Sequence, residues 1–513
     1  MVPMPPTSEQ PGYSVAYKTH IQILGNDTLL QIFSHYRLEN EDSWNLQLTW
    51  RKLAHVCRRW RHLIFDSSFH LDMRLRIANN SPSLDTLSHL PRLPLIIDYS
   101  DGTRTMVQRD EDNIQLGLRQ QGQCVRRVAL LAPSSSFRTW LEPMNKLFPR
   151  LVDFSLLCTT ADDLSLVLPE NFQAPGLRRL ALHGIGLPKK FPLLSSTIAL
   201  SILSLTHIGA SCYLPPEQLV TQIQGLPHLE ELIFGFAIPI SFPSSEEAPI
   251  TAVTLPTLKR LTFRGMGAYI DNLVAQINTP LLERLSLTLF FELTITLLNL
   301  SKFINKTEML GCFAARVILN KDGASIYANH DEQQGIGKLT LHVNCEPPDW
   351  EIDSVLLVCN ALGDVLSIVE ELTLDLDEDG MPSDWENTLD DTLWHELLLP
   401  FVSVKKLHIG SSLALKLAQA LGSEAGELVL PKLQKLEVSL KIDLAQDAFS
   451  SFIEIRELIG HPVHLDPLTL HANESAVLSG KLRGALSAAQ TKLTARSGAC
   501  SGALTTLTAR NGA

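Results

Sequence analysis

The chain has 513 residues, 45% of them hydrophobic, so it is long enough for several domains or one repeat array and can bury a core. Its formal net charge of −12 argues against a nucleic-acid-binding protein, and we expect no nucleic acid among its partners. The eight cysteines show no CxxC spacing, which argues against a zinc site and a disulfide framework and favours a reducing compartment, cytoplasmic or nuclear.

The N-terminal residues 1–18 are rich in proline and lack the apolar stretch of a secretory signal, so we expect them to be disordered. A first helix is predicted next, because Asn26 and Asp27 are good N-cap residues and an apolar stripe of Leu29, Ile32 and Phe33 follows them. This helix opens a segment of about fifty residues that is large enough for only a small core.

A second, strongly amphipathic helix is predicted over LAHVCRRWRHLI, residues 53–64. Its apolar residues recur at steps of three and four and so lie on one face: Leu53, Val56, Cys57, Trp60, Leu63 and Ile64. The simpler interpretation is a core helix whose tryptophan only packs. However, little in this segment can cover two apolar stripes, and an uncovered apolar patch usually marks a protein-interaction site.

Internal repetition is the strongest signal in the rest of the chain. An apolar-x-x-apolar-x-apolar pattern recurs at a spacing close to that of leucine-rich repeats, with a weaker match at 315–319. The matches are VRRVAL (125–130), LVDFSL (151–156), LRRLAL (177–182), LSILSL (200–205), LEELIF (229–234), LKRLTF (258–263), LERLSL (282–287), IGKLTL (336–341), VEELTL (369–374), VKKLHI (404–409) and LQKLEV (433–438). We therefore predict one strand per repeat in a parallel sheet, with crossovers such as 216–229 and 270–280 supplying helices.

The repeats depart from the regular leucine-rich pattern, which has Asn or Cys three residues past each strand match. Ile185, Ile208, Met266 and Phe290 occupy those positions, so we expect an irregular solenoid over residues 90–465. An ordinary leucine-rich α/β domain is the alternative. The apolar segment 281–300 contains three charged residues, which is unusual for a membrane span, so we interpret it as buried globular structure and expect no membrane association.

No catalytic motif is present, and we expect neither an enzyme nor a cofactor. The segment DLDEDGMPSDWE, residues 375–386, does match the EF-hand calcium loop, with Asp375, Asp377, Asp379, Gly380, Met381 and Glu386 at the required positions. It follows a predicted strand rather than a helix, has no second loop and contains Pro382. We therefore favour a solvated acidic loop and assign no metal site. His330-Asp331 is predicted to lie in a polar loop.

The tail, residues 475–513, is dominated by small residues, and LTARSGA (493–499) recurs as LTARNGA (507–513). Such a segment buries too little apolar area to order itself, so we expect a disordered low-complexity tail.

The segment around VCRRWR resembles an F-box and, with the trailing irregular repeats, the chain resembles a fungal-type F-box protein. The match to the F-box pattern rests on Leu24, Ile32, Phe33, Val56, Cys57, Arg58 and Trp60. Gly25 stands where the family has proline, and the loop before VCRRWR is longer than usual. The resemblance implies an F-box over residues 19–75 that docks on the Skp-family adaptor of a cullin-RING (SCF-type) ubiquitin ligase. The adaptor-binding residues would be Leu24, Leu29, Ile32, Phe33, Val56, Cys57 and Trp60.

The expected fold class is therefore α/β, a small all-α N-terminal domain followed by an irregular leucine-rich-repeat solenoid with a parallel sheet. The function hypothesis is a non-catalytic subunit that recognises a protein substrate. The alternative hypotheses are a leucine-rich scaffold without ubiquitin transfer and a calcium-regulated binder. By strand alternation, substrate contacts are predicted for outward residues, in a strip that is more basic over 260–284 and more acidic near 371–379. They are Arg127, Arg179, Glu231, Arg260, Arg264, Arg284, Glu371, Asp375, Lys406 and Lys435.

Overall fold

The computed structural model divides the chain into two compact units. The first contains Met1–Ile77 with Pro82–Ile96, and the second contains Ala78–Ser81 with Ile97–Ala513. The structure describes residues 23–38, 52–67, 75–79, 81, 94–100, 106–160, 165–188, 194, 197–240, 252–290, 296–320, 323–331, 336–344, 351–377, 391–423, 429–440 and 442–467. The predicted disordered segments, 1–18 and 475–513, lie outside these residues.

The first unit is built from short helices around a small core. Its elements are α2 (Asn26–Leu38), a helical turn over residues 52–56, α4 (Arg58–Asp66) and β1 (Leu75–Ile77). The core side chains among them are Leu29, Phe33, Ala54 and Ile64, each at most 4% exposed. The Trp60 ring lies edge-on against Phe33, with ring centroids 4.7 Å apart. The two predicted helical segments therefore pack on each other.

The prediction of one continuous helix over residues 53–64 is wrong. Cys57 has an extended backbone (φ −158°, ψ 167°) and serves as the N-cap of α4, its sulfur accepting a hydrogen bond from the Trp60 backbone N–H at 3.4 Å. A side-chain acceptor at this position satisfies an N–H that a helix start leaves unpaired, so a new helix can begin there. The break removes Val56 and Cys57 from the buried stripe, and both side chains are exposed.

The second unit contains a long, mostly parallel sheet, and β2 (Leu95–Tyr99) spans the division between the units in the sequence. The strands that follow pair in the order β3-β4-β5-β6-β7-β9-β11-β14-β13-β12-β15-β16-β17-β18. They are β3 (Val125–Ala132), β4 (Asp153–Cys158), β5 (Arg179–His183), β6 (Ile202–Ile208), β7 (Glu231–Phe236), β9 (Arg260–Gly265), β11 (Arg284–Phe290), β12 (Ala314–Asn320), β13 (Gly323–Asp331), β14 (Ile336–Asn344), β15 (Glu371–Leu376), β16 (Lys406–Ile409), β17 (Lys435–Val438) and β18 (His464–Pro467). A separate pair joins β8 (Val253–Thr254) to β10 (Ile277–Asn278).

All eleven matched segments contain a strand, which confirms the predicted leucine-rich-repeat-like solenoid. In the regular repeats the strand begins at the third residue of the match, as β5 does within LRRLAL and β9 within LKRLTF. The apolar positions stack in register: Leu182 pairs with Leu205, which is followed by Phe234, Phe263 and Leu287 on the next strands. Each repeat therefore buries its apolar side chains against its neighbours.

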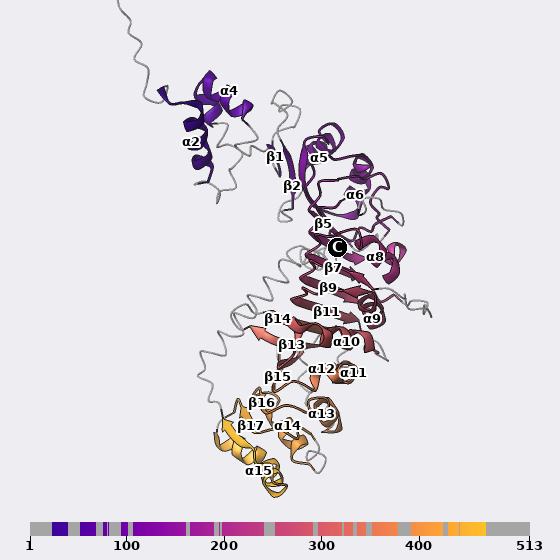
Figure 1. The fold of residues 1–513 in the computed structure, drawn as a ribbon, viewed down its shortest axis with the longest axis vertical. Helices are drawn as coiled ribbons and strands as arrows, with labels where there is room; N and C mark the ends of the chain where they lie inside the picture. Colours follow the sequence, from indigo (N-terminus) through magenta and orange to yellow (C-terminus); the bar gives the residue numbers. More distant parts are fainter. Residues whose placement is uncertain are drawn as a thin grey trace, which may run out of the picture. The chain divides into compact units, whose positions relative to one another are not determined.

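Helices cover one face of this sheet (Figure 1), and α8 and α9 confirm the predicted crossover helices at 216–229 and 270–280. We call the opposite face the outer face. The helices and short 3-10 turns are α5 (Gln108–Gln120), α6 (Ser134–Leu141), η2 (Glu142–Met144), η3 (Ala210–Cys212), α8 (Pro216–Ile223), α9 (Gly267–Ala275), α10 (Leu298–Lys306), η4 (Glu308–Leu310), α11 (Glu351–Ala361), α12 (Gly363–Leu366), α13 (Asp391–Leu398), α14 (Ala414–Leu421) and α15 (Ile442–Leu458).

The parallel order is broken between β11 and β15, which the sequence did not predict. The strand over IGKLTL, β14, pairs with β11, whereas the earlier β12 pairs with β15; β13 lies between β12 and β14 and is antiparallel to both. Gly323 begins β13 with φ 134°, a conformation that favours glycine, after a very short connection from β12. The prediction that His330-Asp331 lies in a polar loop is therefore wrong, because both residues belong to β13.

Candidate functional site

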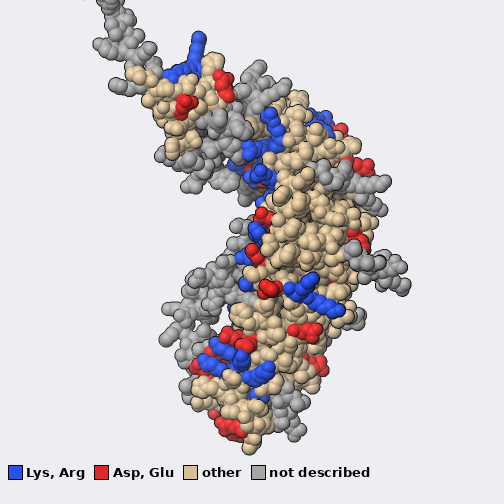
Figure 2. Space-filling model, in the orientation of Figure 1, with Lys and Arg blue, Asp and Glu red and all other residues tan. Residues whose placement is uncertain are grey.

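The predicted substrate-binding residues other than Arg264 and Asp375 lie in register near the start of successive strands. One row on the outer face runs Arg127, Asp153, Arg179, Ile202, Glu231, Arg260 and Arg284. A second row runs Glu371, Lys406, Lys435 and His464. Figure 2 shows basic and acidic side chains interleaved along the side of this unit that faces away from the helices. None of the predicted residues is buried.

Several of these charges pair with each other across adjacent repeats. Arg260 on β9 donates to Glu231 on β7 at 2.8 Å, and the Arg127 guanidinium lies 3.4 Å from Asp153. The hydrogen bond from Arg260 to Glu231, opposed by partial burial, raises the pKa of the Arg260 guanidinium. The side chain of Arg260 is thus oriented before any partner binds.

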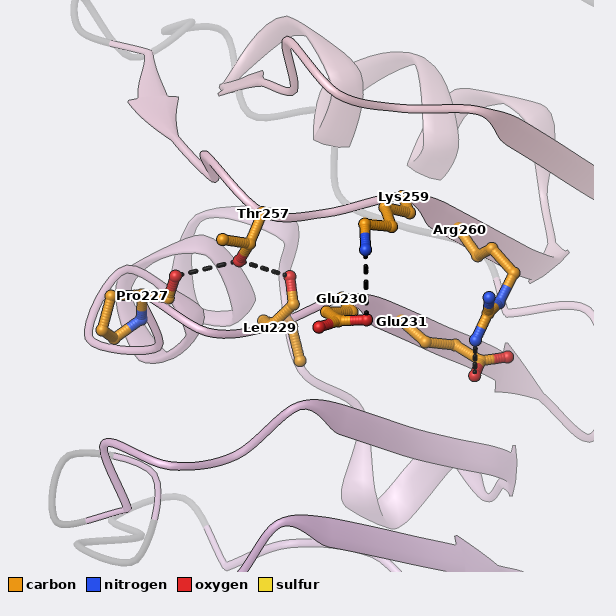
Figure 3. Close-up of polar contacts among 7 residues, drawn as sticks. All are labelled: Pro227, Leu229, Glu230, Glu231, Thr257, Lys259 and Arg260. Carbon is orange, nitrogen blue, oxygen red and sulfur yellow. Dashed lines mark hydrogen bonds and ion pairs between the residues drawn. The ribbon is translucent and has the colours of Figure 1, made fainter.

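The residues just before these strands repeat the same coupling (Figure 3). Lys259 lies 3.5 Å from Glu230, and the Thr257 hydroxyl donates to the carbonyl oxygens of Pro227 and Leu229 at 2.9 and 3.0 Å. The pair Lys405–Glu370, 2.7 Å apart, occupies the equivalent position further along the array. These ion pairs and hydrogen bonds therefore also hold each repeat against the next one.

Glu437 on β17 is a carboxylate of the outer face that pairs with two lysines. It is 8% exposed, and its Oε1 lies 3.1 Å from the Lys406 ammonium and 2.8 Å from that of Lys435. Burial favours the neutral acid, but the hydrogen bonds from Lys435 and Lys406 outweigh it, so the pKa of the Glu437 carboxyl is lowered. The sequence analysis did not single out Glu437, although it follows a predicted lysine by two residues on the same strand.

Replacing Glu437 with glutamine should lower the free energy of unfolding by about 1 kcal/mol at pH 7, because both lysine partners are half-exposed and screened by water. The folded-state pKa lies below the unfolded one, so the stabilisation is present above the ordinary carboxyl pKa of 4.5 and is lost as pH falls through the folded value. Urea denaturation of both proteins at pH 7 and below pH 4.5 should show the difference shrinking. Glu371→Gln, which replaces an exposed carboxylate, should leave the free energy of unfolding unchanged at both pH values.

Asp375, the first residue of the calcium-loop match, lies within β15. Its Oδ2 accepts a hydrogen bond from Arg316 at 2.6 Å, and its Oδ1 accepts the Leu376 backbone N–H at 3.0 Å. Both oxygens therefore have partners within the strand layer. The remainder of the motif, from residue 378 onward, lies outside the described residues, and within the described ones no group of three His, Cys, Asp or Glu side chains could hold a metal ion.

The predicted adaptor-binding residues separate into buried and exposed sets. Leu29 and Phe33 are core residues, Leu24 and Trp60 are half-buried, and Ile32, Val56 and Cys57 are exposed. Asn26 does not act as the predicted N-cap, because α2 already includes it. Its side-chain oxygen instead accepts two hydrogen bonds from the Arg59 guanidinium, at 2.9 and 3.3 Å, and Arg59 also donates to the Leu24 carbonyl at 2.6 Å. Arg59 thus holds the start of α2 against α4.

A third group on the outer face consists of His183, His207 and Arg264, and the sequence analysis predicted only Arg264. His183 and His207 stack at the ends of β5 and β6, with ring centroids 4.9 Å apart, and Arg264 lies near the end of β9. The available signal was position: His183 directly follows LRRLAL, and His207 follows LSILSL by two residues. Strand alternation assigns His207 to the helix-covered face, so the stacking of the two rings could not be predicted.

Comparisons with known proteins add little beyond this description. No protein-family model and no curated protein sequence matches the chain. Among solved structures it is similar to the leucine-rich repeat-containing protein LegL7 from Legionella pneumophila, at 13% identity, covering 76% of this chain and 98% of that one, with a TM-score of 0.25. No helix among the described residues is long and apolar enough to cross a membrane.

Proposed function

We propose that the chain is a substrate-recognition subunit of an SCF-type ubiquitin ligase, in which the N-terminal unit binds a Skp-family adaptor and the repeats bind a protein substrate. The observation that carries this proposal is the exposure of apolar side chains on a small helical unit. Ile23 is 68% exposed, Val56 59% and Ile32 44%. Apolar side chains left uncovered on such a small unit favour a protein-binding role.

The contacts within this unit support a preformed docking surface. The Arg59 bonds to Asn26 and to the Leu24 carbonyl connect α4 to the start of α2, and the Cys57 cap fixes where α4 begins. Trp60 packs on Phe33 through its edge and stays half-buried. These residues belong to the segment that resembles an F-box, so the resemblance and the exposed surface coincide.

The repeats would supply substrate recognition through the charged rows of the outer face. Such a receptor needs no catalytic residue. It would hold the substrate near an E2-charged RING subunit, so that a substrate lysine meets the thioester at a high effective concentration. The paired arginines and glutamates are already oriented, which reduces the conformational entropy lost on binding.

Val56→Asp is the sharpest test of the adaptor contact. Val56 is 59% exposed, so a carboxylate there leaves the core of the unit intact while placing a charge in the proposed interface. Loss of an interface anchor is worth about 2 kcal/mol, so capture of a purified Skp-family adaptor should weaken by about thirtyfold. Affinity can be measured by biolayer interferometry with the full chain immobilised.

The matched control is Leu415→Asp, which makes the same change at a 61% exposed leucine on α14 of the repeat unit. This variant should bind the adaptor as tightly as the unaltered chain. Trp60→Ala should also lose binding, with circular dichroism confirming that the repeats remain folded. Undiminished adaptor binding by Val56→Asp would contradict the F-box assignment and leave the alternative, a repeat scaffold without ubiquitin transfer.

A further inference from the structure

Two histidines are brought together at the carboxyl ends of β5 and β6 on the outer face. The rings of His183 and His207 stack with an interplanar angle of 19°, and the His183 Nδ1 lies 3.0 Å from the Thr206 hydroxyl oxygen. The carboxyl ends of parallel strands are a common location for ligand sites in open sheets. The pair therefore lies where a binding site is expected.

The backbone of β6 is irregular at the residue that completes this pair. The register with β7 shifts between Leu205 and Ile208, and His207 has φ 57°, in the left-handed region that few residues other than glycine adopt. Without this bulge, alternation would turn His207 toward the helices. With it, Thr206 and His207 share the outer face, and Ile208 is buried at 3% exposure. Bulges that redirect a side chain in this way are frequent beside functional sites.

Arg264 supplies a fixed positive charge in the same row. His183 pairs with Thr206 and Gly235 pairs with Arg264, so β7 contributes a glycine to the row between the histidines and the arginine. A Cβ at Gly235 would lie 3.0 Å from the Arg264 Cβ, so only glycine leaves this position open. The Arg264 guanidinium lies over the Phe290 ring of β11, 5.4 Å from its centroid, and this contact restrains the side chain.

The electrostatics of this cluster are one-sided. Burial, followed by the nearby His207 and Arg264, lowers the pKa of His183 to about 4, and burial and Arg264 lower the pKa of His207. Both imidazoles are therefore neutral at pH 7. The charged or titratable groups that act on the two imidazoles are His207 itself, on β6, and Arg264, on β9. On the other side of His183, β4 places Leu157 opposite it. No carboxylate of the described residues is among the groups that act on the imidazoles.

We propose that His183, His207 and Arg264 form a binding site for an acidic side chain, a carboxylate, of the protein partner that the outer face holds. The carboxylate would accept hydrogen bonds from the Arg264 guanidinium and from an imidazole N–H. This inference names the chemistry of the partner and so rests on the proposed function of the outer face. It does not depend on adaptor binding.

Binding at this site should be linked to proton uptake. A bound carboxylate supplies the missing opposite charge, so the histidine pKa values are higher in the complex than in the free chain. Affinity therefore rises as pH falls from neutrality toward the free-chain value of about 4 for His183. Each unit by which one pKa rises corresponds to a tenfold gain in affinity once the proton is bound.

The test uses the full chain without adaptor and a fluorescein-labelled hexaglutamate peptide, followed by fluorescence anisotropy at constant ionic strength. Binding should be tighter at pH 5.5 than at pH 7.5, and it should tighten further toward pH 4.5 as more of the complex binds a proton. Arg264→Gln should weaken it at both pH values, and the double variant His183→Asn, His207→Asn should bind equally at both. Asparagine tolerates the left-handed backbone of residue 207, so the bulge is retained. His228→Asn, at an exposed histidine before β7, is the matched control and should behave as the unaltered chain.

Unchanged binding by Arg264→Gln, or a pH response that persists in the double variant, would overturn the proposal. A second readout does not depend on variants: the imidazole proton resonances of the unaltered chain are titrated with and without the peptide. The titration of His183 should move upward from about pH 4 when the peptide is bound. An unmoved titration at saturating peptide would equally overturn the site, whatever the outcome of the Val56→Asp experiment.

Discussion

Tyr269→Ala is expected to lower the free energy of unfolding of the repeat unit by about 3–5 kcal/mol, the range for removing a large buried aromatic side chain. Tyr269 on α9 is 1% exposed and stacks between the sheet and the neighbouring crossover. Its ring lies 5.5 Å from that of Phe234 and 5.4 Å from that of Phe263, both nearly parallel to it. The substitution would leave a cavity where α9 covers β7 and β9. Urea denaturation followed by circular dichroism measures the loss.

The Tyr269 hydroxyl allows packing to be separated from hydrogen bonding. It donates to the Leu214 carbonyl at 2.8 Å in a buried position, and burial holds the phenol pKa well above its ordinary value of 10, so the donor proton is retained. Tyr269→Phe keeps the ring and removes only this bond, so it should cost about 1 kcal/mol. Similar losses for the alanine and phenylalanine variants would contradict a packing role for the ring.

Trp394→Ala should have an effect of similar size, about 3–5 kcal/mol, in the later part of the array. Trp394 on α13 is fully buried, but its indole Nε1 has no hydrogen-bond partner among the described residues. Trp394→Phe therefore removes volume without breaking a hydrogen bond and should cost well under half as much. Because each repeat depends mainly on its neighbours, both effects should be local, and hydrogen exchange can measure this. Backbone amides of β16 should lose protection before those of β5.

The repeat pattern predicted the sheet because the leucines that define it are the residues that stack. Leu180, Leu203, Leu232 and Leu261 pair in register from strand to strand, and each lies at the apolar position that the pattern requires. The pattern did not reveal the order of the strands. A match such as IGKLTL indicates a strand with one buried face, but it carries no information about which neighbour that strand joins.

The site was predicted only where simple alternation holds. Arg260 and Lys406 are on the outer face because they precede a buried leucine by one residue in a regular strand. His207 could not be placed in this way, since one extra residue in β6 reverses the side of the sheet on which it lies. Likewise, the split at Cys57 depends on a backbone angle and not on periodicity, so the helical pattern of LAHVCRRWRHLI extended across it.

The reversed β12–β13–β14 segment has a consequence for how the protein is made. As the chain leaves the ribosome, each strand of the long sheet from β4 to β11 can join a strand that has already emerged. The next strand, β12, cannot, because its two neighbours, β13 and β15, are both translated later. The edge of β11 therefore stays unpaired until residues 336–344 emerge to form β14. Over that interval the nascent chain presents an open strand edge, which exposes it to aggregation and makes it a target for chaperones.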